Sequence, residues 1–416
     1  PVHRLFERRV EKHPGRIAQR FDGGEWSYEE LNRRANRLAH RLQEAGVGRN
    51  DVVGVSMERS PALVAALLGV LKTGAAYTAL EPSSPAERLR YIVGDAEADV
   101  IVCDDSGREA AEWGPERTIV SFDSRASAGT VTDNPGVSVE PQQVAYVLYT
   151  SGTTGRPKGV RMSHRGLASH VVAFRQGPYG GDERTGDSRR CFLFHSSYGF
   201  DASVTEIYPP LIAGDTVAIA PPDISDEPSR FGRVVARQGV TDLLLTPTQL
   251  EMLVELAAEE TWTRLQRVYT AGEALTEATR QKFFEVADAK LANLYGVTEM
   301  CCGQTMMSVT PHRDGATPIG EPQPNYEVCV ASSVLEPMPV GVSGEICIAG
   351  SGEADGYWQM PRATAMAFVP NPWDDRSGAR VYCTGDLARW QPDGNLEYLG
   401  RIDHQVQLRG NRLELE

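Results

Sequence analysis

The sequence predicts an α/β protein with two doubly wound, mainly parallel sheet subdomains that carry helices on both faces, and a small β-rich subdomain that forms a distorted barrel. Three observations predict this class. Short apolar runs alternate with amphipathic helical patterns over residues 27–103, and the alternation resumes over residues 191–295. From about residue 320 onward, closely spaced glycine and proline separate short strands. A chain of 416 residues can bury several such cores.

The first part of the chain has a βαβαβ pattern. Ser27-Tyr-Glu-Glu30 is typical of a capped helix start, and this helix should end near Gly46. Ser60-Pro61 should open a second helix that runs to about residue 72. We further expect a helix over 85–96 and strands over 51–57, 75–80 and 100–103. Residues 104–143 should be mostly irregular, with one short strand over 118–122.

The later parts of the chain continue with strands and helices, and then with strands alone. We expect strands over 144–149, 191–195, 216–220, 242–245, 267–269 and 290–295. Helical patterns cover 249–259 and 277–287. The β-rich part should contain strands over 327–330, 344–348, 381–384 and 396–398. These patterns predict subdomains at about 1–140, 141–319 and 320–399.

The composition excludes several classes of function. The formal net charge is −14 and the pI is about 5.2, so we expect neither a nucleic-acid nor an anionic-membrane partner, because both attract basic proteins. The seven cysteines, including adjacent Cys301 and Cys302, have neither zinc-site spacing nor the density of a disulfide scaffold. We expect buried, reduced thiols. The N-terminus lacks a secretory apolar region, and no run of about 18 apolar residues occurs, so we expect a cytoplasmic protein.

The segment YTSGTTGRPKGV (149–160) is the most informative motif, and it directly follows the predicted strand over 144–149. Its serine and threonines offer hydroxyl groups, and its glycines let backbone N–H groups approach an anion closely. Lys158 adds a mobile positive charge. The spacing differs from Walker A, which disfavours a P-loop NTPase. An ordinary Gly/Ser/Thr turn is the alternative, and twelve residues of this kind disfavour it. The segment therefore predicts a phosphate-binding loop.

Five further segments share an order with a known superfamily. They are LKTGAAYTALEP (71–82), NLYGVTE (293–299), GEICIAG (344–350), YCTGDLARW (382–390) and GRIDHQVQLRG (400–410). With the loop, they resemble the core motifs of the adenylate-forming enzymes, which include acyl- and aryl-CoA synthetases, luciferases and nonribosomal peptide synthetase adenylation domains. The resemblance is greatest to the peptide synthetase branch and covers nearly the whole chain. Val297 is a departure, because the family usually has proline there, and we expect it to alter loop stiffness more than chemistry.

The resemblance implies a catalytic set for ATP. In-line attack of a carboxylate on the α-phosphorus gives an acyl adenylate and pyrophosphate, and it requires charge neutralisation more than acid or base groups. Thr298 would contact the α-phosphate and Glu299 would hold Mg²⁺; a lone Thr-Glu pair is otherwise typical of a solvated helix start. The phosphate loop, with Lys158 as its cation, would be formed by Thr150, Ser151, Gly152, Thr153, Thr154, Gly155 and Lys158.

The resemblance also implies a nucleoside site. Tyr295 offers a flat surface to adenine and Asn293 offers an amide to its exocyclic amine. Asp386 resembles the carboxylate that accepts both ribose hydroxyls, although a turn carboxylate is the plain alternative. Tyr398 and Arg401 are weaker assignments near the ribose. The remaining nucleotide positions are Gly272, Glu273, Ala274, Leu294 and Gly296.

Substrate choice should depend on Asp201, which resembles the aspartate that pairs with the α-ammonium group of an amino acid. A plainer interpretation makes Asp201 a polar residue beside a helix whose capping box is Ser203 and Glu206, and both interpretations can hold together. His195 should either border the path of the carboxylate or be a buried structural histidine. The other pocket positions are mostly apolar, which predicts a neutral, largely hydrophobic amino acid: Phe200, Ala202, Thr205, Leu244, Tyr269, Ala271, Leu294, Cys302 and Gly303.

The resemblance places an adenylation core over 1–399, and a hinge at Asp403 with the start of a truncated C-terminal subdomain over 400–416. The family's catalytic lysine would lie in that subdomain, so we expect this chain to bind ATP and amino acid but to adenylate slowly. The aminoacyl group would pass to the phosphopantetheine of a peptidyl carrier protein, and a small activator protein is a further candidate partner. Two alternatives are an acyl- or aryl-CoA ligase, which would not need Asp201, and a catalytically silent nucleotide-binding interaction module.

Overall fold

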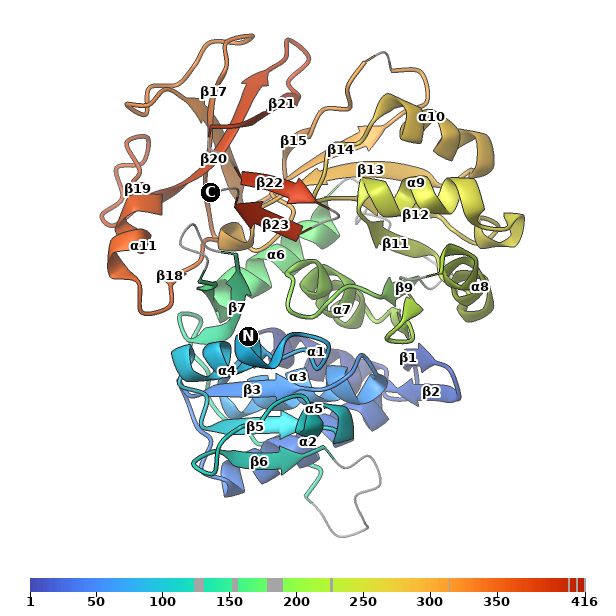
Figure 1. Ribbon diagram of the computed structural model, residues 1–416, viewed down its shortest axis with the longest axis vertical. Coiled ribbons are helices and arrows are strands. Elements are labelled where there is room, and N and C mark those ends of the chain that lie inside the picture. The colour runs from blue at the N-terminus through green and yellow to red at the C-terminus, as the bar shows by residue number, and fades with distance from the viewer. Residues whose placement is uncertain are drawn as a thin grey trace. The chain divides into compact units, whose positions relative to one another are not determined.

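The computed structural model describes residues 1–122, 131–151, 156–177, 190–224, 227–313 and 315–402, and the backbone of strands at 405–408 and 411–414. The chain divides into two compact units (Figure 1). Unit 1 comprises Pro1–Tyr149, Gly159–Ala168 and Arg189–Ser225, and unit 2 comprises Thr150–Lys158, Ser169–Ser188 and Asp226–Glu416. Each unit contains parallel strands and helices, and unit 2 adds a curled antiparallel sheet. The predicted α/β class is confirmed.

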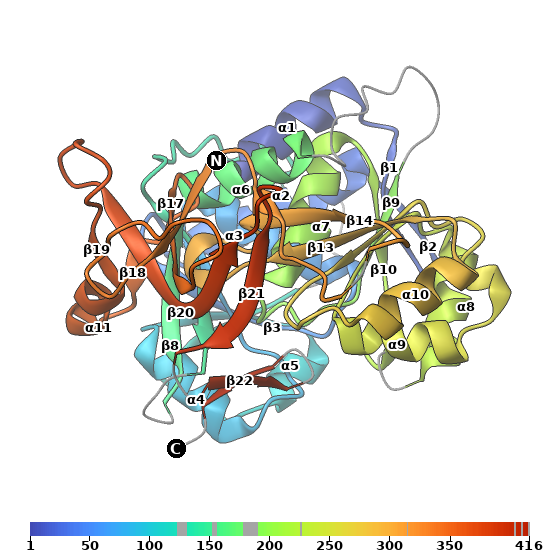
Figure 2. The same cartoon turned by 90° about the horizontal axis from the view of Figure 1, so that it is seen from above.

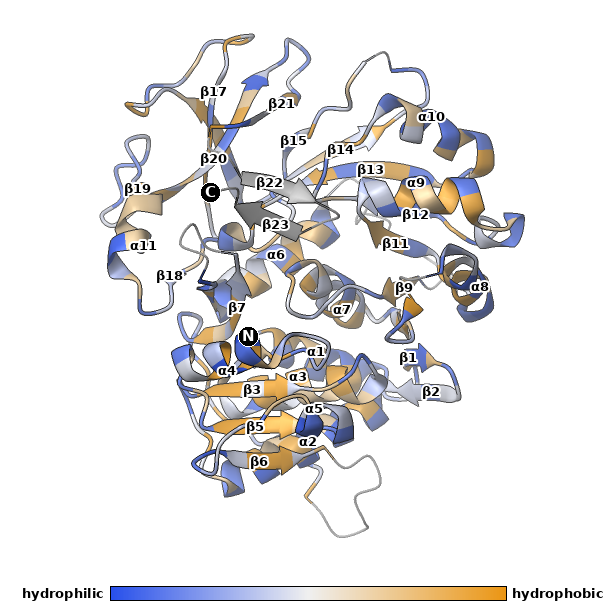
Figure 3. Cartoon of the chain, viewed as in Figure 1, coloured by the Kyte–Doolittle hydropathy of each residue, from blue (hydrophilic) through white to orange (hydrophobic). Residues whose placement is uncertain are grey.

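Unit 1 contains a mainly parallel sheet in the order β8-β7-β4-β3-β5-β6. Strands β4, β3, β5 and β6 run parallel, and β7 runs parallel to β4. The central strands are apolar, as Figure 3 shows for β3 and β5, because helices cover the faces of such a sheet. The strands are β3 (Val52–Ser56), β4 (Ala76–Ala79), β5 (Val100–Cys103), β6 (Thr118–Ser121), β7 (Val144–Thr150) and β8 (Lys158–Ser163).

The helices of this sheet begin where the capping residues predict. Ser27 accepts the N–H of Glu30 at the start of α2 (Tyr28–Glu44), and Ser60 accepts the N–H of Leu63 at the start of α3 (Pro61–Thr73). Helix α3 is apolar around its circumference, buries every residue from Leu63 onward, and packs on β3, β4 and α2. The other helices are α1 (Val2–Lys12), α4 (Ala86–Asp95), which confirms the helix predicted over 85–96, and the short α5 (Asp105–Glu109). The sequence patterns did not predict α5.

A second group of strands in unit 1 has the order β9-β10-β1-β2. Strand β10 (Thr216–Ile219) runs parallel to β9 (Cys191–Phe194) and to β1 (Ile17–Phe21), whereas β2 (Gly24–Ser27) pairs antiparallel with β1. Helix α7 (Ala202–Ala213) packs against β9, β10 and α1. The sequence patterns did not predict β1 and β2, because their polar residues break the apolar runs.

Unit 2 begins its strand order with parallel β11 (Asp242–Leu245), β12 (Arg267–Thr270) and β13 (Lys290–Tyr295). Strands β14 (Thr305–Val309) and β15 (Glu321–Pro322) then pair antiparallel. The helices are α8 (Pro228–Gln238), α9 (Pro247–Leu256) and α10 (Glu277–Val286). Helix α9 starts earlier than predicted, because Thr246 forms a capping box with Gln249 and Pro247 occupies the first helical turn.

The β-rich part of unit 2 is antiparallel and follows the order β16-β17-β20-β19, with β21 also paired to β20. Figure 2 shows the curvature of β20 and the adjacent β21. The strands are β16 (Tyr326–Ala331), β17 (Gly344–Gly350), β19 (Phe368–Pro370), β20 (Arg380–Trp390) and β21 (Leu396–Arg401). The remaining elements are β18 (Gly356–Tyr357), α11 (Pro361–Ala367) and a hairpin of β22 (Gln405–Leu408) with β23 (Asn411–Glu414).

Where the structure describes the chain, every helix falls short of the length and apolar character that crossing a bilayer requires.

Glu206 on α7 anchors the segment that follows β9. Its side chain is fully buried, and its Oε2 accepts the N–H groups of His195 at 3.2 Å and Ser196 at 3.0 Å. Oε1 accepts the Ser196 hydroxyl at 2.8 Å and lies 3.3 Å from His195 Nε2. The alternative in which Ser203 and Glu206 form a capping box is therefore wrong, because Glu206 turns to the segment after β9 and Ser203 donates its hydroxyl to the carbonyl of Phe200.

Burial raises the pKa of Glu206 to about 8, against the opposing effects of the Ser196 hydrogen bonds and the charge of Arg59. The folded protein thus retains a proton that the unfolded chain releases above about pH 4.5. The free energy of unfolding should therefore fall as the pH rises from about 4.5 to about 8, because the folded state binds more protons in that window.

The Glu206→Gln variant tests this pH dependence, since glutamine mimics the protonated carboxyl group at every pH. We expect the free energy of unfolding of the variant, relative to the parent, to rise by at least about 1.4 kcal/mol between about pH 5 and about pH 8, the equivalent of one pKa unit. Urea denaturation at both pH values measures it. The exposed Glu44→Gln serves as the control and should show no such trend. The prediction is contradicted if the free energy of unfolding of Glu206→Gln differs from that of the parent by the same amount at both pH values.

Candidate active site

The predicted phosphate loop connects β7 to β8 in a strand–loop–strand arrangement. Thr150 is the last residue of β7 and Lys158 the first of β8, and the Thr150 hydroxyl lies 3.5 Å from the Lys158 carbonyl oxygen at the base of the loop. Ser151 is half-buried. The predicted loop residues Gly152, Thr153, Thr154 and Gly155 lie outside the described residues.

Within unit 2, Lys158 and Glu299 both lie next to one tyrosine, Tyr357. The Lys158 ammonium is 5.8 Å from the centre of the Tyr357 ring, and the Tyr357 hydroxyl donates to Glu299 Oε1 at 2.8 Å. Burial, and next the charge of Glu299, raise the pKa of Tyr357, so the hydroxyl keeps its proton. Tyr357 was missed by the sequence analysis, because an isolated Gly-Tyr strand carries no recognisable motif.

Thr298 and Glu299 belong to a single 3₁₀ turn, Thr298–Met300, directly after β13. Glu299 is 1% exposed, and its backbone carbonyl accepts the N–H of Ala354 at 2.9 Å. The carboxylate is therefore held in the interior at the carboxyl end of a parallel strand. That end is where ligands bind in open α/β sheets.

The backbone around this turn is close-packed and explains one glycine. A Cβ atom on Gly296 would lie 2.0 Å from the backbone nitrogen of Gly303, so no larger residue fits there. Cys302 and Gly303 have φ values of 57° and 62°, in the left-handed region. The chain thus folds back after Thr298 and brings the predicted positions Gly296, Cys302 and Gly303 together.

Val297 has a partner that proline could not have. Its N–H donates to Oε1 of the fully buried Gln304 at 2.7 Å, and Nε2 of Gln304 donates to the Met300 carbonyl at 2.9 Å. Proline has no N–H, so it would remove the first of these hydrogen bonds. The departure from the family motif is therefore accommodated by a side chain seven residues away.

Four residues of the predicted nucleoside site form one cluster in unit 2: Tyr295, predicted for adenine, and Asp386, Tyr398 and Arg401, predicted for the ribose. Asp386 is 4% exposed; Oδ2 accepts the Tyr295 hydroxyl at 2.5 Å, and Oδ1 accepts Arg401 Nη1 at 2.8 Å. The Tyr398 hydroxyl lies 3.5 Å from Oδ1, and the Tyr295 and Tyr398 ring centres are 6.2 Å apart. Burial, and then the charge of Asp386, raise the pKa of Tyr295 well above its usual range, so Tyr295 donates. Residues 295 and 386 are brought together only by the fold.

Asn293 and Glu273 make hydrogen bonds that hold neighbouring segments. Asn293 is 2% exposed; its Nδ2 donates to the Pro318 carbonyl at 2.9 Å, and its Oδ1 accepts the Thr270 hydroxyl at 3.2 Å. Glu273 accepts the N–H of Thr248 at 3.1 Å and the Thr248 hydroxyl at 2.6 Å. Gly272 and Ala274 on either side are exposed. The roles of these residues toward adenine remain predictions.

The predicted substrate positions of unit 2 lie on adjacent strands. Leu244 on β11 and Tyr269 on β12 are register partners, and both are buried. Leu294 is buried on β13, and a Cβ on Gly303 would lie 3.5 Å from its Cδ2 atom. Ala271, directly after β12, is half-buried.

Helix α6 (His164–Gln176) supplies two residues that the sequence analysis missed. The Phe174 ring lies 5.2 Å from that of Tyr269. His170 hydrogen-bonds the backbone of Cys302, and burial lowers its pKa to about 4, so it is neutral at physiological pH. The apolar pattern of helix α6 indicates only that one face is buried. The sequence therefore provides no reason to assign His170 or Phe174 to the site.

In unit 1, the predicted substrate residues surround the start of α7. Asp201 immediately precedes the helix, is half-buried, and makes no side-chain capping hydrogen bond to it. Ala202 and Thr205 are three residues apart and thus on one helical face, with Thr205 buried. His195 is buried beside Glu206, and Phe200 is 43% exposed. Both alternatives for His195 therefore remain open, since burial is compatible with each.

The segment before Asp201 is held by two charged residues of the same unit. Glu81 accepts the Ser197 hydroxyl at 2.6 Å and the N–H of Tyr198 at 3.2 Å. Arg59 donates to the carbonyls of His195 and, at 2.7 Å, Pro221. The sequence analysis assigned neither residue, although Glu81 lies in the LKTGAAYTALEP segment. These contacts fix the segment from 195 to 198 from two sides.

The sequence from residue 6 to 358 matches the family of AMP-binding enzymes. Tyrocidine synthase 3 of Brevibacillus parabrevis is 38% identical over 416 residues, which is 100% of this chain and 6% of that protein. Tyrocidine synthase 1 of the same organism is 37% identical over 417 residues, or 100% of this chain and 37% of that protein. The chain therefore spans well under two thirds of these relatives.

Solved structures agree. The nonribosomal peptide synthetase FmoA3 superimposes with a TM-score of 0.88 at 29% identity, covering 96% of this chain and 42% of that chain, and its AMPPNP-bound form gives 0.87. The N-terminal subdomain of Klebsiella oxytoca NpsA, in complex with 3-hydroxybenzoyl-AMSN, superimposes with a TM-score of 0.83 at 27% identity. The match covers 96% of this chain and 99% of that chain. The chain therefore belongs to the family of AMP-binding enzymes, and it is similar to nonribosomal peptide synthetases of known sequence and structure.

Proposed function

We propose that this chain activates an amino acid with ATP to give the aminoacyl adenylate and pyrophosphate, and passes the aminoacyl group to the phosphopantetheine thiol of a peptidyl carrier protein. The proposal rests on two groups of contacts in unit 2. The Lys158 ammonium lies over the ring of Tyr357, whose hydroxyl donates to Glu299. Asp386 accepts hydrogen bonds from Tyr295 and Arg401. A site for a nucleoside triphosphate requires a cation for the phosphates, a carboxylate for the metal ion and an acceptor for the ribose hydroxyls.

Each of these groups would have one role. Lys158 and the hydroxyls and N–H groups of its loop would neutralise the β- and γ-phosphates. Thr298 would contact the α-phosphate. Asp386, fixed by Arg401, would accept the ribose hydroxyls, with Tyr295 against the adenine. AMPPNP bound to FmoA3 supports an ATP site in this fold.

Glu299 fits the proposed Mg²⁺ by the chemistry of its donor. It is a buried carboxylate, and carboxylate oxygens are ligands that Mg²⁺ accepts alongside phosphate oxygens. The Tyr357 hydroxyl that donates to Oε1 would hold the carboxylate in one orientation. When bound, the ion would neutralise charge on the phosphates.

The substrate class rests on Asp201. A structure of FmoA3 holds α-methyl-L-serine-AMP, whereas the NpsA subdomain holds 3-hydroxybenzoyl-AMSN, so this fold accepts acids with and without an amine. Asp201 lies half-buried directly before α7, and a carboxylate in that position would attract the α-ammonium group of an amino acid. Within unit 2, the apolar character of Leu244 and Leu294 supports a neutral, hydrophobic amino acid.

The proposed partners follow from the relatives. Tyrocidine synthases and an artificially fused adenylation–PCP di-domain of NpsA and ThdA support a peptidyl carrier protein as acceptor, in nonribosomal peptide antibiotic biosynthesis. A small activator protein is a further proposed partner. We place the reaction in the cytoplasm, where ATP is supplied and where the cysteines that the structure describes would stay as free thiols.

The Lys158→Ala variant tests the phosphate loop. Loss of one charge-assisted hydrogen bond costs about 1.5–3 kcal/mol, so the dissociation constant for MgATP should rise roughly 10- to 150-fold. Isothermal titration calorimetry measures it, with the exposed Lys290→Ala as the matched control. Unchanged affinity in Lys158→Ala would refute the assignment of Lys158. A folded parent that binds no MgATP would instead favour a catalytically silent module that serves interactions rather than nucleotide binding.

The Asp386→Asn variant tests recognition of the ribose. The parent should bind ATP about tenfold or more tightly than 2′-deoxy-ATP, because a carboxylate acceptor strengthens each hydroxyl hydrogen bond. We expect the variant to lose most of this preference in calorimetric titrations with both nucleotides. Asp393→Asn in an exposed turn should keep it. An undiminished preference in Asp386→Asn sinks the ribose assignment, and the ratio is insensitive to a general loss of affinity.

The Asp201→Asn variant tests the substrate class. For the best ligand in a panel of neutral amino acids, affinity should fall roughly 10- to 150-fold, while binding of the analogue without the amine should stay within about twofold. Competition calorimetry with both compounds gives the two ratios. Asp22→Asn, in an exposed turn of the same unit, is the control. Equal behaviour of the two compounds would favour the acyl- or aryl-CoA ligase.

A further inference from the structure

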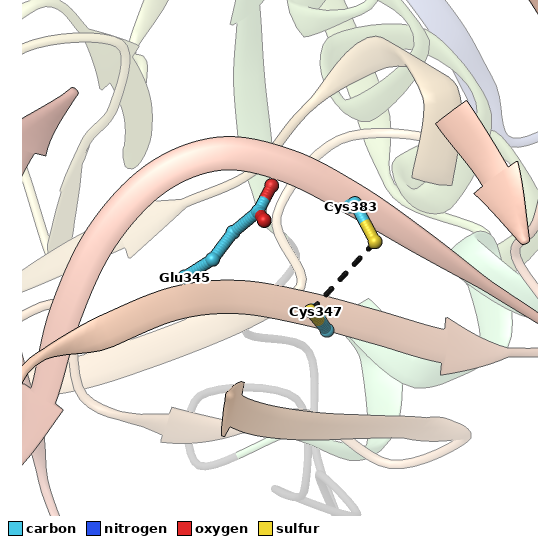
Figure 4. Close-up of side chains that lie close together, drawn as sticks. All are labelled: Glu345, Cys347 and Cys383. Carbon is cyan, nitrogen blue, oxygen red and sulfur yellow. Dashed lines mark hydrogen bonds between the residues drawn. The ribbon is translucent and has the colours of Figure 1, made fainter. Parts of the chain in front are cut away.

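Three metal-ligating side chains meet on the curled sheet of unit 2, apart from the groups assigned above. Glu345 and Cys347 come from β17 and Cys383 from β20 (Figure 4). Their ligand atoms all lie within 4.8 Å of one another. Cys347 and Cys383 are register partners on the antiparallel strands, which places their side chains on the same face.

The distance between the sulfur atoms suits a shared metal ion. The two Sγ atoms are 3.9 Å apart. Two sulfurs bound to one tetrahedral Zn²⁺ at about 2.3 Å would be about 3.8 Å apart, so they need almost no movement. A disulfide requires about 2.05 Å, so forming that bond would draw the strands or side chains together. The present spacing therefore favours a bridging ion over a bond between the sulfurs.

The third ligand is already held in place from β20. Oε1 of Glu345 accepts the N–H of Gly385 at 2.8 Å, which keeps the carboxylate facing that strand. Such a hydrogen bond to a ligating carboxylate orients it toward a metal. The register shifts between Glu345 and Cys347, as in a β-bulge. Glu345 pairs with Leu387 and Cys347 with Cys383, so β20 has more residues than β17 between the two pairs.

The surroundings protect one side of the cluster and leave the other accessible. Cys347 is 1% exposed and packs with Ala331, Ala349 and Val381 in the core of the sheet. Glu345 and Cys383 are half-buried, so solvent reaches their side of the cluster. An ion can enter from that side, and water can occupy a fourth coordination position.

We propose that Glu345, Cys347 and Cys383 form a binding site for a thiophilic divalent cation of the Zn²⁺ class. Both cysteines bind as thiolates, so one ion displaces two thiol protons into the buffer, and nothing is oxidised or reduced. The spacing of cysteines along the chain predicted no such site, because the ligands are paired across strands rather than grouped in sequence.

Titration of the reduced chain with Co²⁺, a spectroscopic substitute for Zn²⁺, tests the site. We expect one equivalent to produce the near-ultraviolet thiolate-to-cobalt charge-transfer band and the visible bands of a tetrahedral ion, and Zn²⁺ to displace it. Cys347→Ser and Cys383→Ser should each weaken binding at least tenfold and reduce the charge-transfer band. Glu345→Gln should weaken binding roughly 10- to 100-fold while the sulfur band persists.

Cys329→Ser is the matched control, because Cys329 is the other register partner of Cys347 but is not one of the three ligands. It should bind Co²⁺ like the parent, and unchanged circular dichroism and MgATP affinity identify the variants that fold. Equal loss in Cys329→Ser overturns the ligand set. Binding without a charge-transfer band, insensitive to the variants, means adventitious binding to surface carboxylates and overturns the site. So does a parent that binds no Co²⁺ when reduced but loses two thiols under mild peroxide, the behaviour of a redox pair.

Discussion

Buried carboxylates impose the main constraint on this protein, because a charge removed from water must be compensated within the fold. Glu206, Glu299 and Asp386 are each 4% exposed or less. Each accepts a hydrogen bond from outside its own helix, turn or strand: from the segment after β9 for Glu206, from Tyr357 for Glu299, and from Tyr295 and Arg401 for Asp386. The groups that a nucleotide would meet are therefore the same groups that fix the loops in place.

The compensation takes two chemical forms with different consequences. Around Asp386, a guanidinium and two phenol hydroxyls lie at hydrogen-bond distance from the carboxylate oxygens. Around Glu206, burial is the largest effect and favours the neutral form. Under the proposed function, the first arrangement would prepare an acceptor for a ligand, whereas the second holds the segment after β9 in unit 1. The main chain near Glu299 is constrained as well. Glycine at 296 and the left-handed backbone at Cys302 let the segment after β13 fold back tightly.

Local patterns predicted much of the fold, since helix caps and apolar runs are properties of neighbouring residues. The starts of α2 and α3 and the bounds of β5, β11 and β13 agree with the sequence analysis. The site was predicted only as separate motifs, and the role of Tyr357 depends on a contact across 58 residues that no periodicity contains. Ser203 and Glu206 have the spacing of a capping box, but the demand of a buried carboxylate overrode that local preference. The cysteine cluster required strand register, which the spacing of residues in one chain does not define.

The hydrogen bond between Val297 and Gln304 has an evolutionary consequence. Replacing Val297 by the proline of the motif that it resembles would leave the buried Gln304 amide oxygen without the Val297 N–H, so we expect that exchange to be tolerated only together with a change at 304. The two positions are therefore expected to covary, and Gln304 would oppose a return to proline at 297. Conformity to a motif at one site can thus be governed by the history of another.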